Sequence, residues 1–326
     1  MTALTMVEAI RDAMARAMEE DPDVLVLGED VGHDGGVFRA TEGLFERFGE
    51  ERVIDTPLSE ALLAGLAVGL GAQRMRPVVE FQFDGFLYPA IDQLVNHAGR
   101  LRNRTRGRLS CPIVIRAPYG GGIRAPEHHS ESPETFYAHM PGIRTVIPST
   151  PRRAYGLMLA AIRDPDPVVF LEPKRLYRAV REEVADDGEA LPLDQCFKIR
   201  DGTDVTLVGW GASLARLLEA ADLLAEEGIE AGVIDVATLK PLDAATILDA
   251  VRRSGRCVIA HEAPRSYGPA AEIAALLAGE GLFSLLAPVE RVTGFDVPVP
   301  LPRLEDHYLP DAERIAAAAR RLMGYR

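Results

Sequence analysis

DTPLSEALLAGLAVGLGAQRMRPVVEF, residues 55–81, contains the three kinds of segment from which the whole chain is built. Residues 55–60 form a polar turn that ends in Ser59, a residue type that caps helices, and Glu60. The residues after Glu60 are small and apolar and predict a helix over 59–73. Residues 77–81 form a short segment rich in β-branched residues, which is typical of a buried parallel strand. A turn, a helix and a buried strand in this order indicate an α/β fold.

The same alternation continues on both sides of this stretch. The first helix is expected to begin at a capping box formed by Thr5 and Glu8. Before residue 180, strands are predicted at 24–27, 77–81, 112–116, 144–147 and 168–171, and helices at 59–73, 89–104 and 151–163. After residue 200, strands are predicted at 205–208, 232–236, 257–261 and 291–293, and helices at 213–227, 244–253, 270–278 and 311–323.

An acidic segment at 181–190, almost free of apolar residues, separates the two series and is interpreted as a linker or an exposed crossing segment. The chain is therefore expected to hold two α/β domains, at 1–186 and 201–326, joined by a linker at 187–200. A length of 326 residues agrees with two domains.

Composition excludes several classes of protein. With 36 basic and 49 acidic side chains the net charge is −13, and so acidic a surface repels the phosphates of nucleic acid. The longest uncharged apolar stretch, 61–72, is far shorter than a membrane span. Cys111, Cys196 and Cys257 are scattered and form no disulfide framework or zinc motif. A reducing, cytoplasmic location is expected, although a mature chain would already have lost any transit peptide.

Glu60 is the most informative candidate for chemistry. One interpretation is a first-turn glutamate that interacts with the helix dipole. The other is a functional acid, because a carboxyl that leads a helix apolar on nearly all faces is buried and poorly solvated, and can keep its proton. On the residues alone, both interpretations remain open.

Glycine-rich turns are candidates for a phosphate site. The loop Gly28-Glu29-Asp30 follows the first predicted strand, where open parallel sheets bind ligands. Gly35-Gly36 and the glycines at 120–122 could form nests of backbone amides. Neither lies in a nucleotide-binding motif, and isolated glycine-rich turns are more often only turns.

The loop Glu127-His128-His129-Ser130 offers a histidine for acid–base chemistry near neutral pH. Adjacent histidines point apart in an extended chain and have no HExxH motif beside them, so a metal site is disfavoured. His139 and His261 are isolated and are interpreted as structural. Gly211-Ala212-Ser213-Leu214-Ala215 departs from GxSxG at its last position, so a hydrolase is set aside.

Many segments, in order along the chain, match one family of proteins. They are GEDVG (28–32), GGVFRATEGL (35–44), DTPLSE (55–60), EFQF (80–83), HHSESPE (128–134), VIPSTP (146–151), VVFLEPKRLYR (168–178), VIDVATLKPLD (233–243), HEAP (261–264) and LLAP (285–288). On these segments, the sequence resembles the β subunit of the thiamine-diphosphate-dependent E1 component of 2-oxo acid dehydrogenase complexes.

This resemblance implies a transketolase-like fold, with a pyrimidine-binding α/β domain followed by a smaller transketolase C-terminal α/β domain. It also implies an α2β2 heterotetramer with the cofactor where α and β meet. In this family the partner subunit carries a GDG motif and an asparagine that hold Mg²⁺ and the diphosphate. No GDG occurs in this sequence, which therefore looks like half of an active site.

The resemblance also implies roles for individual residues. Glu60 matches the glutamate that hydrogen-bonds N1′ of the aminopyrimidine. Leu58 and Gln82 match pocket residues, and Phe86 matches an aromatic residue that stacks on the pyrimidine. His129 matches a histidine that assists acylation of the lipoyl group of E2, and His128 is the weaker choice.

A structural potassium site, built largely from backbone carbonyls, is a further implication. By position it would use Ile113, Ala161, Ile162, Asp164 and Asp166. Asp166 stands where mammalian members have asparagine, so an extra carboxylate replaces a neutral amide at this position.

The predicted activity is oxidative decarboxylation of a 2-oxo acid and reductive acylation of the lipoyl group of E2. FLEPKRLYR favours branched-chain substrates, and GGVFRATEGL and VIPSTP also resemble pyruvate members. An acetoin-cleaving relative or a split transketolase is an alternative enzyme, and a noncatalytic assembly subunit is an alternative of another class. The acidic surface is suited to a basic binding domain of E2.

Overall fold

The computed structural model describes residues 1–126 and 128–325. The chain divides into two units: unit 1 consists of residues 1–119 and 136–193, and unit 2 of residues 120–135 and 194–326. The loop at 120–135 therefore belongs to unit 2, although in sequence it interrupts unit 1. A linker at 187–200 between independently folding domains stays a prediction.

A parallel sheet forms the centre of unit 1. Its strands pair in the order β6-β7-β5-β4-β2-β3, and every pairing among these six is parallel. The bounds are β2 (Val24–Gly28), β3 (Val53–Asp55), β4 (Arg76–Glu80), β5 (Val114–Tyr119), β6 (Arg144–Val146) and β7 (Val168–Pro173). Because the strands are parallel, their carboxyl ends lie at one edge of the sheet, where the loops can gather functional side chains.

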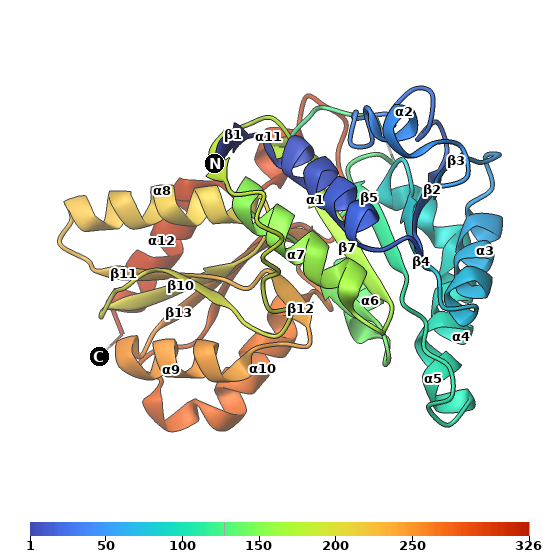
Figure 1. The fold of residues 1–326 in the computed structure, drawn as a ribbon. Coiled ribbons are helices and arrows are strands. Elements are labelled where there is room, and N and C mark those ends of the chain that lie inside the picture. Colours follow the sequence, from blue (N-terminus) through green and yellow to red (C-terminus); the bar gives the residue numbers. More distant parts are fainter. Residues whose placement is uncertain (127, 326) are drawn as a thin grey trace. The chain divides into compact units, whose positions relative to one another are not determined.

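Helices cover both faces of this sheet, with α1 beside α7 on one face and α3 and α4 on the other (Figure 1). Helix α1 begins at the predicted capping box, in which Thr5 and Glu8 bond to each other's backbone amides. The bounds are α1 (Met6–Glu20), α2 (Leu44–Phe48), α3 (Glu60–Ala72), η1 (Asp84–Ala90), α4 (Ile91–Asn96), η2 (Ala98–Arg100), α5 (Leu101–Arg104), α6 (Glu134–His139), α7 (Pro151–Arg163) and η3 (Lys174–Leu176).

Unit 2 is built on a second sheet with the order β14-β13-β10-β11-β9, in which only the pairing of the edge strand β9 is antiparallel. Helices α8 and α12 cover one face, and α9 and α10 cover the other (Figure 1). The bounds are β9 (Phe197–Arg200), β10 (Val205–Gly209), α8 (Ser213–Glu226), β11 (Ala231–Asp235), β12 (Thr238–Lys240), α9 (Ala244–Ser254), β13 (Cys257–Pro264), α10 (Pro269–Glu280), η4 (Leu282–Ser284), β14 (Glu290–Gly294), α11 (Glu305–Tyr308) and α12 (Ala312–Met323).

The core of unit 2 lies between its sheet and the pair α8–α12. Leu217 and Leu224 of α8 and Ile315 and Leu322 of α12 are fully buried against the strands. Residues spaced seven apart lie on one face of a helix, so each of these pairs faces the sheet together. Nowhere in the described ranges is a helix both long and apolar enough to cross a membrane.

One predicted helix is wrong as a continuous element. Residues 89–104 form a chain of short segments, from η1 through α4 and η2 to α5, because the backbone turns at His97, with φ −120° and ψ −65°. Beside this break, a Cβ on Gly99 would lie 3.0 Å from the carbonyl oxygen of Pro141. The loop at 140–142 thus packs against a helix break that apolar periodicity does not reveal.

Helix α3 differs from the prediction in its burial. Leu63, Ala64 and Ala67 are buried, but Leu62 and Leu66 on the other face are 55% and 41% exposed. The helix is therefore covered on one side within this chain, although its sequence is apolar all round. An apolar helix face open to water is characteristic of a surface that another protein covers.

The acidic segment at 181–190 is exposed for most of its length, as predicted, but it is attached to unit 1. Its residues Glu182–Val184 form β8, which pairs antiparallel with β1 (Thr2–Leu4) at the start of the chain. The Tyr155 hydroxyl of α7 donates to Asp186 at 2.7 Å and accepts from the Gly188 amide at 3.2 Å. We call residues 181–190 the strap, because these contacts hold the segment against unit 1.

Candidate functional site

Four polar side chains gather at the carboxyl ends of β2 and β4 in unit 1. Glu29 and Asp30 directly follow β2, and Gln82 follows β4, where its amide donates to the Asp30 carboxylate at 3.1 Å. Glu60 is the first residue of α3 and lies close enough to Glu29 to act on its ionisation. The structure thus brings Glu60 and Gln82 into one cluster with two acids to which no role was assigned from sequence.

The turn that carries Glu60 is fixed to the loop after β2. The Asp55 carboxylate accepts from the amides of Gly32 and His33, at 2.6 and 3.2 Å, and the Thr56 amide donates to the Gly28 carbonyl at 3.0 Å. Ser59 is the N-cap residue of α3, as expected, but its side chain makes no capping hydrogen bond. Contacts of Asp55 and Thr56 with the loop after β2 therefore hold the turn that carries Glu60, which is half-buried rather than fully buried.

Glu29 is the acid that sequence reasoning missed. Its side chain is only 6% exposed, and burial, together with the nearby charges of Glu60 and Asp30, raises its pKa, although a hydrogen bond from the Ser59 amide opposes this. Oε1 of Glu29 has no hydrogen-bond partner among the described residues. An acid next to a strand end was visible in the sequence, but its proximity to Glu60 was not.

Two further predicted residues flank this cluster. Leu58 is 77% exposed, two residues before Glu60, so an apolar side chain stands open beside the acids. Phe86 is half-buried in η1, and its ring lies edge-to-face with Phe83 at 5.6 Å between centroids. An open leucine and an aromatic ring offer apolar contacts to a flat heterocycle.

A buried ionic network lies in the sheet next to this cluster. Arg116 of β5 pairs with Glu80 of β4, and it donates to both oxygens of Glu172 of β7 at 2.6 and 2.7 Å. The Tyr177 hydroxyl donates to the same Glu172 carboxylate at 2.5 Å. Burial raises the pKa of Glu80, and the charge of Arg116 opposes that rise. The network joins β4, after which Gln82 lies, to its neighbours β5 and β7.

The predicted histidines lie in unit 2, in the loop at 120–135. His128 is exposed, with Nδ1 3.5 Å from the Glu131 carboxylate, and His129 is partly exposed, with its amide donating to the Pro126 carbonyl at 3.2 Å. Ser130 is buried, and Glu127 lies outside the described residues. His129 is thus accessible from solvent, as a histidine that acts on an external group must be.

The glycine nests are not open phosphate sites. The Gly121 amide donates to Glu262 at 2.9 Å, and the Gly122 amide donates to Glu305 at 2.8 Å. The Gly35 and Gly36 amides donate to backbone carbonyls of their own loop, those of Gly32 and Asp30. The chain itself satisfies these donors, so both turns serve the structure.

His261, which the sequence analysis interprets as structural, is buried in unit 2. Its ring is fully buried and stacks on Trp210, with 5.0 Å between centroids and 12° between planes. Burial, with a smaller contribution from the charge of Arg291, lowers the pKa of His261 to about 3. This buried imidazole is therefore neutral near pH 7.

Burial of neutral His261 predicts acid sensitivity. The unfolded chain takes up a proton near pH 6.5 and the folded chain near pH 3, so the stabilisation present above pH 6.5 is lost as pH falls toward 3. Between pH 7.5 and 5 this loss is about 2 kcal/mol. We expect His261→Phe to abolish this loss of stability, as measured by urea unfolding at pH 7.5 and pH 5. His139→Phe, at the exposed end of α6, is the control; equal pH dependence of wild type and His261→Phe would contradict the assignment.

The predicted potassium ligands lie in unit 1, where the end of α7 meets the sheet. They are Ile113, Ala161, Ile162, Asp164 and Asp166. Arg76 donates to the carbonyls of Ile162 and Asp164, at 2.9 and 3.4 Å, and the Asp166 carboxylate pairs with Arg102 at 2.6 Å. Carbonyl oxygens suit K⁺, but a guanidinium on two of them opposes a second cation. The ion stays a prediction.

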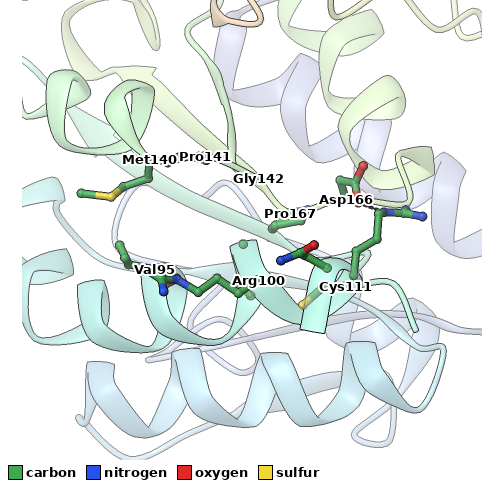
Figure 2. Close-up of a pocket in the computed structure, with 12 residues that line it drawn as sticks. Val95, Arg100, Cys111, Met140, Pro141, Gly142, Asp166 and Pro167 are labelled. Atoms are coloured by element: carbon green, nitrogen blue, oxygen red, sulfur yellow. Dashed lines mark hydrogen bonds and ion pairs between the residues drawn. The ribbon is translucent and has the colours of Figure 1, made fainter. Parts of the chain in front are cut away.

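A cavity of about 450 Å³ lies between the α4–α5 segment and the loop at 140–142 (Figure 2). Asp166 and Cys111 line it, and of the predicted site residues only Asp166 does so. Burial, with a smaller contribution from the charge of Asp166, raises the pKa of the Cys111 thiol to about 12. A thiol that resists ionisation is a poor nucleophile. The lining residues of this cavity include none of the acid cluster.

Comparison with known proteins gives the class of the fold. Residues 2–180 match the family described as "Transketolase, pyrimidine binding domain", and residues 194–315 match "Transketolase, C-terminal domain". A split gene transketolase, solved as an inactive β4 tetramer, superimposes with a TM-score of 0.82 at 24% identity, covering 99% of both chains. The chain is a transketolase-like protein of two α/β domains, as the resemblance implied.

Curated relatives narrow this class. The chain is 47% identical to the pyruvate dehydrogenase E1 component subunit beta of Acholeplasma laidlawii, over 99% of this chain and 98% of that one. It is 45% identical to the pyruvate dehydrogenase E1 component subunit beta of Bacillus subtilis, covering 100% of both, and 42% identical to the 2-oxoisovalerate dehydrogenase subunit beta of the same organism, covering 99% of both. The chain belongs to the family of β subunits of the thiamine-diphosphate-dependent E1 components of 2-oxo acid dehydrogenases.

Proposed function

We propose that this chain supplies the pyrimidine-binding half of a thiamine diphosphate site in an α2β2 E1 enzyme. The observation that carries the proposal is the position of Glu60, which leads α3 beside Glu29 at the carboxyl ends of β2 and β4. A carboxyl group placed beside a second, buried carboxyl is suited to exchange a proton with a ring nitrogen.

The residues at this site fit an aminopyrimidine ring. The buried Oε1 of Glu29 and the hydroxyl of Thr56 have no hydrogen-bond partner within the described part of the chain. Both atoms can therefore form a hydrogen bond with a ligand. The Glu60 carboxyl would exchange a proton with N1′, while Leu58 and Gln82 line the ring and Phe86 stacks on it. When bound, thiamine diphosphate supplies the electron sink for decarboxylation.

The partner α subunit would supply the remaining half of the site. The sequence contains no GDG motif, so Mg²⁺ and the diphosphate are assigned mainly to that subunit. The exposed leucines Leu62 and Leu66 of α3 form an apolar face of the kind that subunit association covers. The acyl acceptor would be the lipoyl group of E2.

Branched-chain 2-oxo acids are the proposed substrates, on the strength of FLEPKRLYR at 170–178. Pyruvate is the alternative, because relatives named for pyruvate and for 2-oxoisovalerate are similarly close in sequence. The test is an assay of the α–β complex with 3-methyl-2-oxobutanoate, pyruvate, acetoin and sugar phosphates. Preference for acetoin or a sugar phosphate would overturn the proposed activity, and turnover of none would favour a noncatalytic assembly subunit.

His129 is proposed to assist acylation of the lipoyl group. We expect His129→Ala to lower the ratio of lipoyl acylation to decarboxylation at least tenfold, since general acid–base assistance is typically worth 10²–10⁴-fold in rate. Decarboxylation is measured with an artificial electron acceptor, and acylation with a free lipoyl domain. His128→Ala is the matched control, one residue away in the same loop. Equal losses in the two assays for His129→Ala would argue against the role.

A further inference from the structure

Two buried carboxylates bind the backbone of the loop that carries His129. Glu305, at the start of α11, accepts from the amides of Gly122 and Arg124 at 2.8 and 2.9 Å, one on each oxygen. Glu262, on β13, accepts from the Gly121 amide at 2.9 Å. Glu305 is 1% exposed and Glu262 is 6% exposed, so water does not compete for these bonds.

These contacts link residues far apart in sequence. The partners of Glu305 lie 183 and 181 residues away, and Gly121 lies 141 residues from Glu262. A charged acceptor makes stronger hydrogen bonds to amides than a neutral one. A buried carboxylate that lost them would be left charged and unsatisfied. The carboxylates and the backbone amides therefore both favour the arrangement of the glycine-rich turn in which these hydrogen bonds form.

The loop needs such support because its backbone is unfavourable without it. Arg124 and His128 have φ of +56° and +70°, in the left-handed region that costs energy for residues other than glycine. The Gly120 amide closes the base of the loop on the Glu131 carbonyl at 2.8 Å. Glu305 accepts a hydrogen bond from the amide of Arg124, so this carboxylate stabilises a residue whose backbone is in the left-handed region.

We propose that Glu305, with Glu262, is a positioning residue that sets the location of His129 by holding the backbone at 121–124. The inference rests on the proposed function, in which His129 assists lipoyl acylation. Glu305 touches neither the acyl donor nor the lipoyl group in this proposal. It acts through the loop, by fixing one arm of the turn whose other end bears the histidine.

The first test measures the loop itself. In Glu305→Gln an amide NH2 replaces one acceptor oxygen and faces a backbone N–H, so one of the two bonds is lost at almost unchanged volume. Hydrogen–deuterium exchange of a peptide spanning 120–126 in the assembled complex should accelerate at least tenfold, with β10 unchanged. Glu280→Gln, at the exposed end of α10, is the matched control. Unchanged exchange at 120–126 would overturn the proposal.

The second test measures the consequence. The ratio of lipoyl acylation to decarboxylation should fall at least tenfold in Glu305→Gln, and the same change on a His129→Ala background should cause no further fall. Equal loss of both activities, or an additive loss in the double variant, would overturn the positioning role. Glu262→Gln provides the same two tests if Glu305→Gln fails to fold.

Failure of the proposed function would be visible separately. A wild-type complex that does not acylate a lipoyl domain would reject that function before any variant is made. The positioning role would then be rejected with it, and the exchange measurement would still decide whether Glu305 holds the loop.

Discussion

Glu60→Gln is expected to lower decarboxylation by the assembled α–β complex about 10²–10⁴-fold, the range typical for loss of a general acid–base group. A glutamine keeps the size of the side chain and its hydrogen-bonding ability but cannot take up or release a proton. In the proposed site that proton is exchanged with the pyrimidine ring. The measurement is turnover of 3-methyl-2-oxobutanoate and pyruvate with an artificial electron acceptor, so that E2 is not needed.

The fold should survive this change, because Glu60 is half-exposed and its turn is fixed by the contacts of Asp55 and Thr56. Thermal unfolding and assembly with the α subunit should therefore match wild type. Glu50→Gln, an exposed glutamate of the same unit, is the matched control. Near-normal turnover by Glu60→Gln in an assembled complex would reject the proposed mechanism.

Arg116→Met is expected to cost about 3–5 kcal/mol of folding free energy, which is typical for breaking a buried ion pair by removing one partner. Arg116 is 1% exposed and is the cation between Glu80 and Glu172. Methionine fills part of the space but leaves two buried carboxylates without a counter-charge. Urea unfolding at pH 7.5 measures the loss.

The deficit of Arg116→Met should be smaller at pH 5. A buried carboxyl with a raised pKa binds its proton more tightly in the folded state than in the unfolded state, so acid favours folding relative to neutral pH. Arg216→Met is the control, because its pair with Glu219 is partly exposed and worth at most about 1 kcal/mol. A loss in Arg116→Met no larger than in this control would show that the network is not needed for stability.

Local sequence signals predicted most of the helices and strands. Helix α7 spans Pro151–Arg163, as predicted, because Thr150 caps it and Pro151 suits the first turn. The pairing of β1 with β8 and the helix break at His97 were not predicted. In both cases the cause is a contact between distant segments, which apolar periodicity does not encode.

The sequence proposed candidate site residues one by one but did not predict their arrangement. Glu60 was identified from its place before an apolar helix, and family motifs added Leu58 and Gln82. The raised pKa of Glu29 could not be foreseen, because it depends on burial and on a charge 31 residues away in sequence. The Glu305 contacts are still more distant. Motifs indicate which residues act, and tertiary structure determines what surrounds them.

The strap at 181–190 has a consequence for how this chain is produced. Because β8 pairs with β1, a segment late in unit 1 is bound to residues 2–4, and Arg181 donates to the Ala3 carbonyl at 2.8 Å. An affinity tag fused directly ahead of residue 2 would therefore lie beside this strand pairing.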